Sequence, residues 1–201
     1  MISLRIILTG HRPSRLNYHG SDGYDRNNPL RRALRRHLRD VFACIAAEHH
    51  PCEALLITGG ALGVDWDGAG VALRMGMPYE VYVPFDGQES RWPSEAQVSY
   101  ADLLQRASRV VVCHEGRPFS DAHAGRLLLA RNVRMLADNP AAVRRVVAVS
   151  DGGTGGTAQC IQAARRDFGL PVHVIAPSHV MRDIPEIDAA QRRAIDGVMV
   201  I

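Results

Sequence analysis

The sequence contains no lysine, because all 24 residues counted as Lys+Arg are arginines. This absence excludes a Walker-A lysine, a Schiff-base lysine and a serine–lysine dyad in the chain. A phosphate group would therefore be held by backbone N–H groups, helix N-termini and arginine side chains.

Other absences narrow the class of protein further. No apolar run approaches the ~20 residues that a membrane span needs, and the segment after Met1 lacks the pattern of a signal peptide. There is no G-x-S-x-G elbow, and no G-x-G-x-x-G after the first predicted strand, which argues against a serine hydrolase and an NAD-dependent dehydrogenase. We expect a cytoplasmic protein without membrane contact.

The four cysteines, Cys44, Cys52, Cys113 and Cys160, form no C-x-x-C pair. Each lies in or beside an apolar segment, which favours free, buried thiols in a reducing compartment. A zinc site built on Cys44, the two following histidines and Cys52 is the alternative. The C-x₄-H-H-P-C spacing matches no established ligand pattern, so no metal site is predicted.

Short apolar segments typical of strands alternate with longer segments typical of helices. The predicted strands are Leu4–Thr9, Ala54–Thr58, Tyr79–Pro84, Arg109–Cys113, Arg144–Val149 and Val172–Ala176. The predicted helices are Pro29–Glu48, Val64–Met75, Pro93–Ala107, Asp121–Ala137 and one that ends near Phe168. Strands that are apolar on both faces and separated by helices indicate a mainly parallel sheet covered on both sides. The fold class is therefore α/β, a Rossmann-like doubly wound three-layer domain.

A chain of 201 residues fits one such domain. We assign residues 1–177 to a Rossmann-like nucleotide-binding domain and residues 178–201 to a C-terminal tail packed on or beside it. The D-I-P-E-I-D-A-A-Q-R-R segment of the tail is expected to form one short helix. Residues 17–28 are rich in Gly, Asp and Asn and are expected to form a loop.

Three glycine-bearing turns fall at the carboxyl ends of predicted strands, where open parallel sheets bind ligands. They are T-G-H-R-P at 9–13, T-G-G-A-L-G-V-D at 58–65 and D-G-G-T-G-G-T at 151–157. Glycine lets the backbone approach an anion closely, and the helix after such a turn directs unpaired N–H groups toward it. One such turn is more often only a tight connection, but three together favour an anion-binding site.

The order of these turns, with V-P-F at 83–85 and A-R-N-x-x-M at 130–135, resembles the SLOG superfamily, and within it the YpsA-like Rossmann proteins. The resemblance runs from Gly10 to about Pro177. It implies a sensor or binding protein for a small-molecule nucleotide or nucleotide derivative, with no certain cofactor beyond such a ligand. Because related Rossmann-like proteins often dimerise, it also implies a homodimer.

The resemblance places the ligand-binding residues in the matching motifs. The first turn would open the pocket, the second would form a wall, the A-R-N motif would face the ligand, and the last turn would hold phosphate. These residues are Gly10, Arg12, Gly59, Gly60, Gly63, Asp65, Arg131, Asn132, Gly155, Gly156 and Thr157. For Asp65 the alternative is plain stabilisation of a helix N-terminus, and for Arg131 it is a surface salt bridge. His11 is a further candidate for a phosphate contact.

The cytokinin-activating phosphoribohydrolases of the same superfamily offer a second interpretation. Their P-G-G-x-G-T-x-x-E signature ends in a glutamate that drives cleavage of the N-glycosidic bond. Cys160 stands at the position of that glutamate, and Gln159 cannot act as a general acid or base. Cleavage of a glycosidic or phosphate ester bond would need another carboxylate, so no catalytic residue is assigned. The candidates are Asp65, Asp67, Asp86, Glu89 and Asp151.

The DNA-processing protein DprA, whose Rossmann domain carries a similar G-x-x-x-G-[IV]-D turn and binds single-stranded DNA, offers a third interpretation. Arginines at 31, 32, 35, 36 and 39 cluster on one side of the first predicted helix, where they would follow a phosphate backbone. A solvated helix face or salt bridges to a neighbouring element are the alternatives. Because aromatic residues are only 5% of the chain and the net charge is only +3, nucleic acid is less favoured than a small nucleotide.

Overall fold

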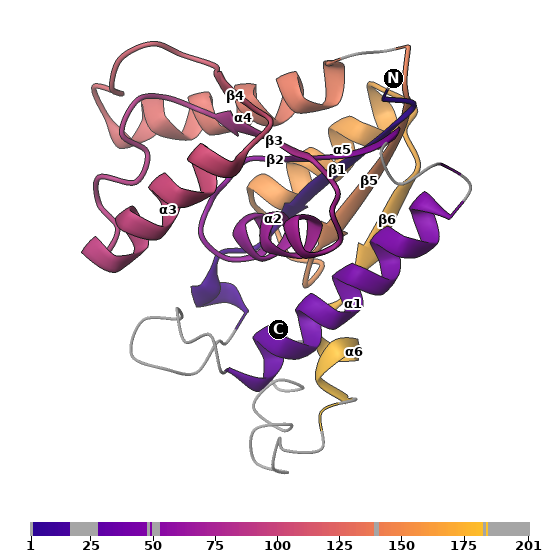
Figure 1. Cartoon of the computed structure of the whole chain (residues 1–201). Helices are drawn as coiled ribbons and strands as arrows, with labels where there is room; N and C mark the ends of the chain where they lie inside the picture. The colour runs from indigo at the N-terminus through magenta and orange to yellow at the C-terminus, as the bar shows by residue number, and fades with distance from the viewer. Residues whose placement is uncertain are drawn as a thin grey trace.

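The computed structural model describes residues 2–16, 28–47, 49, 53–138, 141–182 and 184. Six parallel strands form one sheet in the order β4-β3-β2-β1-β5-β6 (Figure 1). The strands are β1 Leu4–Gly10, β2 Ala54–Thr58, β3 Tyr79–Val83, β4 Arg109–Val112, β5 Val143–Val149 and β6 Val172–Ile175. The sheet confirms the predicted α/β Rossmann-like fold; β2 has the predicted bounds, and each of the other strands differs from its prediction by one residue at one end.

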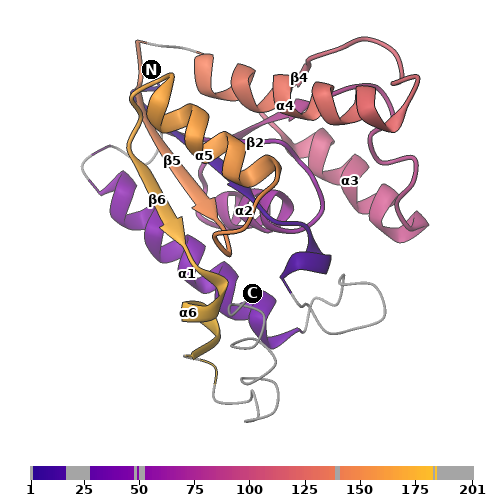
Figure 2. The ribbon, with the colours of Figure 1, turned by 180° about the vertical axis from the view of Figure 1, so that it is seen from behind.

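Helices cover both faces of the sheet, as the two opposite views show (Figures 1 and 2). They are α1 Pro29–Ala46, α2 Val64–Arg74, α3 Ser94–Arg106, α4 Asp121–Ala137, α5 Gly156–Arg166 and α6 Pro177–Arg182, with a short 3₁₀ helix, η1 Pro13–Arg15, after β1. Helices α1, α2, α3 and α6 pack on one face, while α4 and α5 pack on the other. Within the described part of the chain, no helix is long and apolar enough to cross a membrane.

Alternate side chains of the central strand β1 supply the two hydrophobic cores. Ile6 and Leu8 face the α1–α2 layer, whereas Ile7 faces the α4–α5 layer, and all three are fully buried. A strand buried on both faces is apolar at most positions, which is why the apolar runs predicted a covered parallel sheet; the buried Arg5 of β1 is paired with Glu80 of β3.

The tail begins with a helix that the sequence pattern did not predict. Helix α6 packs against α1, and Val180, Met181 and Ile184 join the core on that face. The helix expected in the D-I-P-E-I-D-A-A-Q-R-R segment falls at 183–193, outside the described residues apart from Ile184. Of the loop expected at 17–28, only Asn28 is described, and its side chain accepts the N–H of Arg31 at the start of α1, at 3.1 Å.

Gly68 sets the distance between α2 and β1. A Cβ atom at this position would lie 1.9 Å from Leu8 Cδ2, within the packed core. We expect Gly68→Ala to lower the free energy of unfolding by about 1–3 kcal/mol, because the extra methyl group overpacks this contact. Urea denaturation measures the change.

Gly70, two residues further along α2, provides the matched control. A Cβ there would meet nothing closer than Arg74 Nη1 at 3.6 Å. Gly70→Ala should therefore raise stability by up to about 1 kcal/mol, through helix propensity alone. Equal effects of the two substitutions would contradict the packing argument.

The strand order changes direction at β1. The chain proceeds from β1 through β2 and β3 to β4 on one side, then returns to place β5 and β6 on the other side. In such sheets, ligands bind in the crevice beyond the carboxyl ends of the two strands at the switch point, here β1 and β5. The turns after these two strands are therefore the first place to look for a site.

Candidate functional site

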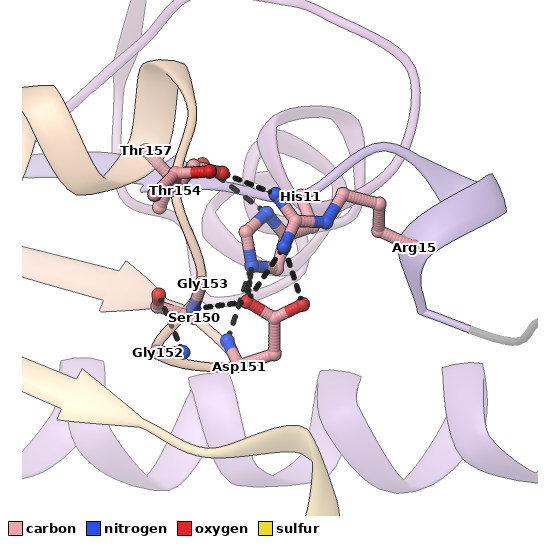
Figure 3. A network of polar contacts seen from close by, with 8 residues as sticks. All are labelled: His11, Arg15, Ser150, Asp151, Gly152, Gly153, Thr154 and Thr157. Carbon is pink, nitrogen blue, oxygen red and sulfur yellow. Dashed lines mark hydrogen bonds and ion pairs between the residues drawn. The ribbon is translucent and has the colours of Figure 1, made fainter. Parts of the chain in front are cut away.

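Side chains from the turn after β1 converge on the turn after β5 (Figure 3). Nε2 of His11 lies 2.9 Å from Asp151 Oδ1, and the backbone N–H of Asp151 points to the same nitrogen at 3.1 Å. Arg15 donates to both carboxylate oxygens of Asp151, at 3.0 and 2.8 Å, and to the carbonyl oxygen of Thr154 at 2.6 Å. The first and last glycine turns are thus tied together across the switch point.

Burial and neighbouring charges set the protonation of this cluster. Burial lowers the pKa of His11, and the opposing influence of Asp151 does not restore it, so the imidazole is neutral at pH 7. Partial burial acts to raise the pKa of Asp151, but the N–H of Gly153, His11 and Arg15 outweigh it and hold that pKa below its usual range. His11 Nδ1 lies 3.5 Å from Thr157 Oγ1, so the imidazole ring lies between the Asp151 carboxylate and this hydroxyl.

The first two glycine turns pack directly against each other. A Cβ at Gly10 would come within 2.5 Å of the Val64 side chain, and one at Gly63 within 2.5 Å of the His11 carbonyl oxygen. Gly63 also has a φ of +103°, a conformation that disfavours other residues. These two glycines are therefore required for packing at the site, independently of any ligand.

Arg131 of α4 and Asp65 of α2 form a buried charged pair behind the second turn. The two residues are 5% and 6% exposed, and Arg131 Nη1 lies 3.7 Å from Asp65 Oδ2. The guanidinium lies against Gly59, where a Cβ would come within 1.2 Å of Nη1. Nη1 also donates to the carbonyl oxygen of Tyr82 at 3.5 Å, while Nε is buried without a hydrogen-bond partner among the described residues. Arg131 is thus an interior residue, and the surface salt bridge considered from the sequence is wrong.

Burial raises the pKa of Asp65 to about 6, even though the charge of Arg131 and the N–H of Ala61, at 3.4 Å, favour the ionised form. The charge of Arg12 acts in the same direction as that of Arg131, which places this exposed arginine near the carboxyl group. A carboxyl with this pKa exchanges a proton near neutral pH, as general acids and bases do.

The helices that start at this edge differ in their charge. The first turn of α2 contains Asp65 and Asp67, which already neutralise the positive end of its dipole. The first turn of α5 contains no acidic residue, and its N-cap residue, Gly155, offers no side-chain cap. A Cβ on Gly156 would have no atom within 4 Å, so this helix start borders open space. Of the two, only α5 presents uncompensated N–H groups to an anion.

Three more residues line the surroundings of the pair formed by Asp65 and Arg131. Asn132 donates to the carbonyl oxygen of Gly156 at 3.5 Å and so links α4 to the last turn. Tyr100 is buried beside Gly60, accepts a hydrogen bond from Gln88, and has a pKa raised to about 12 by burial. Cys160 is buried, and burial raises its pKa to about 11, so it is a neutral thiol at pH 7.

The structure brings all eleven predicted site residues to this edge of the sheet. Gly10, Gly63, Gly59 and Arg131 are linked through the contacts above, and Thr157 meets His11. Arg15, the pairing of Asp151 with His11, and Tyr100 were not predicted. Arg15 lies only three residues beyond Arg12, but no spacing rule marks it. Contact of these residues with a ligand stays a prediction.

The cysteines and the possible metal ligands of the described residues form no further candidate site. Cys44 is exposed, which corrects its prediction as a buried thiol, while Cys113 is partly buried, and both are free. Cys52 lies outside the described residues. In the part of the chain that the structure describes, no group of His, Cys, Asp or Glu residues could hold a metal ion.

Comparisons with known proteins give a family and a fold. The sequence model of the YspA SLOG family (YpsA) matches residues 6–124. None of the curated proteins matches the chain.

Among solved structures, DprA from Helicobacter pylori, described with a single-stranded DNA binding mode, has a TM-score of 0.55 at 15% identity, covering 98% of this chain and 81% of that one. The protein TM1055 has a TM-score of 0.49 at 18% identity, covering 84% and 71%. DprA from Streptococcus pneumoniae has a TM-score of 0.41 at 11% identity, covering 91% and 62%. At such identities the likeness concerns the fold alone.

Proposed function

The chain belongs to the YspA SLOG family, and we propose that it binds a phosphate-bearing nucleotide or nucleotide derivative at the carboxyl edge of its sheet. The supporting observation is the convergence of an uncapped helix start, at α5, with three arginines from two parts of the chain. Arg12 and Arg15 follow β1, and Arg131 comes from α4. In a chain without lysine, a phosphate at this edge of the sheet would be held by such guanidinium groups and by the N–H groups at the start of α5.

The charges within the site suggest how such a ligand is oriented. The phosphate belongs at the start of α5, beside Gly155 and Gly156, because no carboxylate lies in that first turn and the nearby carboxylate of Asp151 is already paired with Arg15. The sugar or base belongs near Asp65, since a carboxylate accepts hydrogen bonds from hydroxyl and amino groups and repels phosphate. Arg131 then holds Asp65 in place and has an unused N–H at Nε.

A second candidate function is cleavage of the bound ligand at its N-glycosidic or phosphate ester bond. The observation that favours it is the opposite pKa shift of two carboxyl groups at one edge of the sheet, with Asp65 raised and Asp151 lowered. Such divergence is typical of acid–base pairs in hydrolases. Cys160 and Gln159 take no part in this interpretation, because the first is a buried neutral thiol and the second is an exposed amide.

Thermal unfolding in the presence of AMP, ADP, NAD, ADP-ribose and cyclic nucleotides tests the proposal. A ligand at 100 times its Kd should stabilise the protein by about 2.7 kcal/mol. Chromatography of the same mixtures for free base or phosphate separates a binding protein, which leaves the ligand intact, from a hydrolase. No stabilisation by any of these compounds would contradict the proposal.

Gly59→Ala tests the position of the pocket. The new methyl group would occupy the place of Arg131 Nη1 and displace the guanidinium from Asp65. We expect the affinity for the compound that stabilises the protein in thermal unfolding to fall at least about tenfold, because one charge-assisted hydrogen bond is lost. Titration calorimetry measures this change. Gly125→Ala on α4, where a Cβ meets nothing within 4 Å, is the control and should leave the affinity unchanged.

A further inference from the structure

Two adjacent hollows lie along α1, α2 and α3, on the face of the sheet that these helices cover. The larger one, of about 420 Å³, shares Arg35 and Arg74 with a neighbour of about 280 Å³. None of the eleven candidate site residues lines either hollow. We call the two together the arginine groove.

The lining of the arginine groove is strongly basic. Among the residues that the structure describes, two acidic ones line it, Glu95 and Asp102, both from α3. Six arginines line it, four of them from α1: Arg31, Arg35, Arg36, Arg39, Arg74 and Arg106. The groove therefore attracts anions.

Part of this charge is neutralised within the protein. The fully buried carboxylate of Asp67 accepts from Arg31 Nε at 2.8 Å and from Arg35 Nε at 2.7 Å. One carboxylate thus serves two guanidinium groups, so salt bridges to a neighbouring element explain these two arginines of the cluster on α1.

The remaining arginines are neutralised unequally. Arg39 pairs with Asp40 and Arg106 pairs with Asp102. In the described part of the chain, Arg36 and Arg74 make no ion pair and remain for a ligand.

The spacing of the cations matches an anion that repeats along a chain. Arg31, Arg35 and Arg39 follow one another at four-residue intervals, which places successive side chains ~6 Å apart along the helix axis. Arg74 of α2 extends the basic lining beyond the helix itself. Arg31, Arg35 and Arg39 are already paired with carboxylates, so they supply a basic edge, and Arg36 and Arg74 are the groups that would contact successive phosphates of a polyanion.

The side of the arginine groove that faces α3 indicates which kind of polyanion fits it. Trp66 lines the groove and is partly buried, and Glu95 and Asp102 lie on the α3 side. An acidic polypeptide would bring its carboxylates against those of α3. A nucleic-acid strand carries phosphates along one edge, and its bases offer amino donors to carboxylates and faces to an aromatic ring. We propose that the arginine groove binds single-stranded nucleic acid, with phosphates along α1 and bases toward Trp66 and α3.

Fluorescence anisotropy with a labelled 12-nucleotide single strand tests this proposal, with DNA and RNA versions of the strand as separate arms. The double variant Arg36→Ala/Arg74→Ala should weaken binding about tenfold and reduce the slope of log K against log salt by about 1.4, because two phosphate contacts are lost. The matched control is Arg126→Ala/Arg165→Ala, which removes two exposed arginines from α4 and α5, on the other face of the sheet. It should bind like the unmodified protein.

Further measurements distinguish strand binding in the arginine groove from nucleotide binding at the candidate site, and a nucleic-acid strand from an acidic polypeptide. Quenching of Trp66 by the strand should disappear in Trp66→Phe, and the Arg36→Ala/Arg74→Ala protein should keep its stabilisation by the small nucleotide. The proposal is overturned if neither DNA nor RNA binds, or if the two double variants bind alike. It is also overturned if poly-glutamate displaces the strand at equal charge concentration, because the groove would then select an acidic polypeptide.

Discussion

Replacing Gly156 by aspartate is expected to abolish nucleotide binding without lowering the stability of the protein. Gly156 begins α5 at the open end of the site, and a side chain there would meet no atom within 4 Å. A carboxylate in the first turn of a helix stabilises it slightly. The same carboxylate would stand where we place the phosphate, and two like charges ~4 Å apart repel by about 4 kcal/mol at an effective dielectric constant of 20. The expected loss of affinity is therefore more than about 100-fold.

Gly156→Asn is the matched control, because it adds a side chain of the same shape without the charge. It should lose much less affinity than Gly156→Asp, and both variants should unfold at or above the temperature of the unmodified protein when no ligand is present. Titration calorimetry and thermal unfolding give the two quantities. Equal affinities for the two variants would show that no anion approaches this helix start.

The arrangement of elements could be predicted from the sequence because the inner strands β1, β2 and β3 are covered on both faces. Continuous apolar runs such as Leu4–Thr9 and Ala54–Thr58 have no other stable environment in a chain of this size. Helix α6 was missed for a physical reason. It has only six residues, too few to show a helical period, and is stabilised by packing of Val180 and Met181 in the α1 layer.

The glycine turns could be predicted as a group, but the role of each glycine could not. Gly10 and Gly63 are needed because the turns after β1 and β2 touch, and Gly59 is needed because Arg131 lies over it. Gly156 has no such neighbour. A sequence pattern records that a side chain is absent, whereas only the structure tells whether protein or open space occupies its place.

The ion pairs of the site were beyond sequence reasoning because they join distant segments. His11 and Asp151 meet only because β5 pairs with β1, although 140 residues separate them. Arg131 reaches Asp65 from a helix on the other face of the sheet. The A-R-N motif was identified through its resemblance to a family, and nothing in its spacing indicated that the arginine would be buried.

Asp65→Asn should make the protein more stable at pH 7 and less able to bind its ligand. The folded protein holds the proton of Asp65 with a pKa of about 6, against 3.8 for an ordinary aspartate. Between these two values the folded state binds more protons than the unfolded chain, so stability falls as pH rises from about 4 to 6. The ionised group therefore costs about 3 kcal/mol at pH 7, at 1.36 kcal/mol for each pKa unit.

Asparagine has the shape of the protonated acid and no charge to bury. Urea denaturation should thus give equal stability for the two proteins near pH 4 and an advantage of up to about 3 kcal/mol for Asp65→Asn at pH 7. Asp151→Asn provides the opposite case. The lowered pKa of Asp151 means that its ionised form stabilises the fold at neutral pH and that this contribution is lost as pH falls through that pKa.

A loss of stability in Asp65→Asn at pH 7 would show that the pair with Arg131 is net favourable, and would remove the reason for regarding Asp65 as functional. A gain of stability in Asp65→Asn at pH 7, which we expect, would support a functional role for Asp65. A protein that keeps a costly buried carboxylate, when an isosteric amide would be more stable, retains it for what the charge or the exchangeable proton does to a ligand. Calorimetry of the same variant should then show weaker binding of the nucleotide that stabilises the unmodified protein.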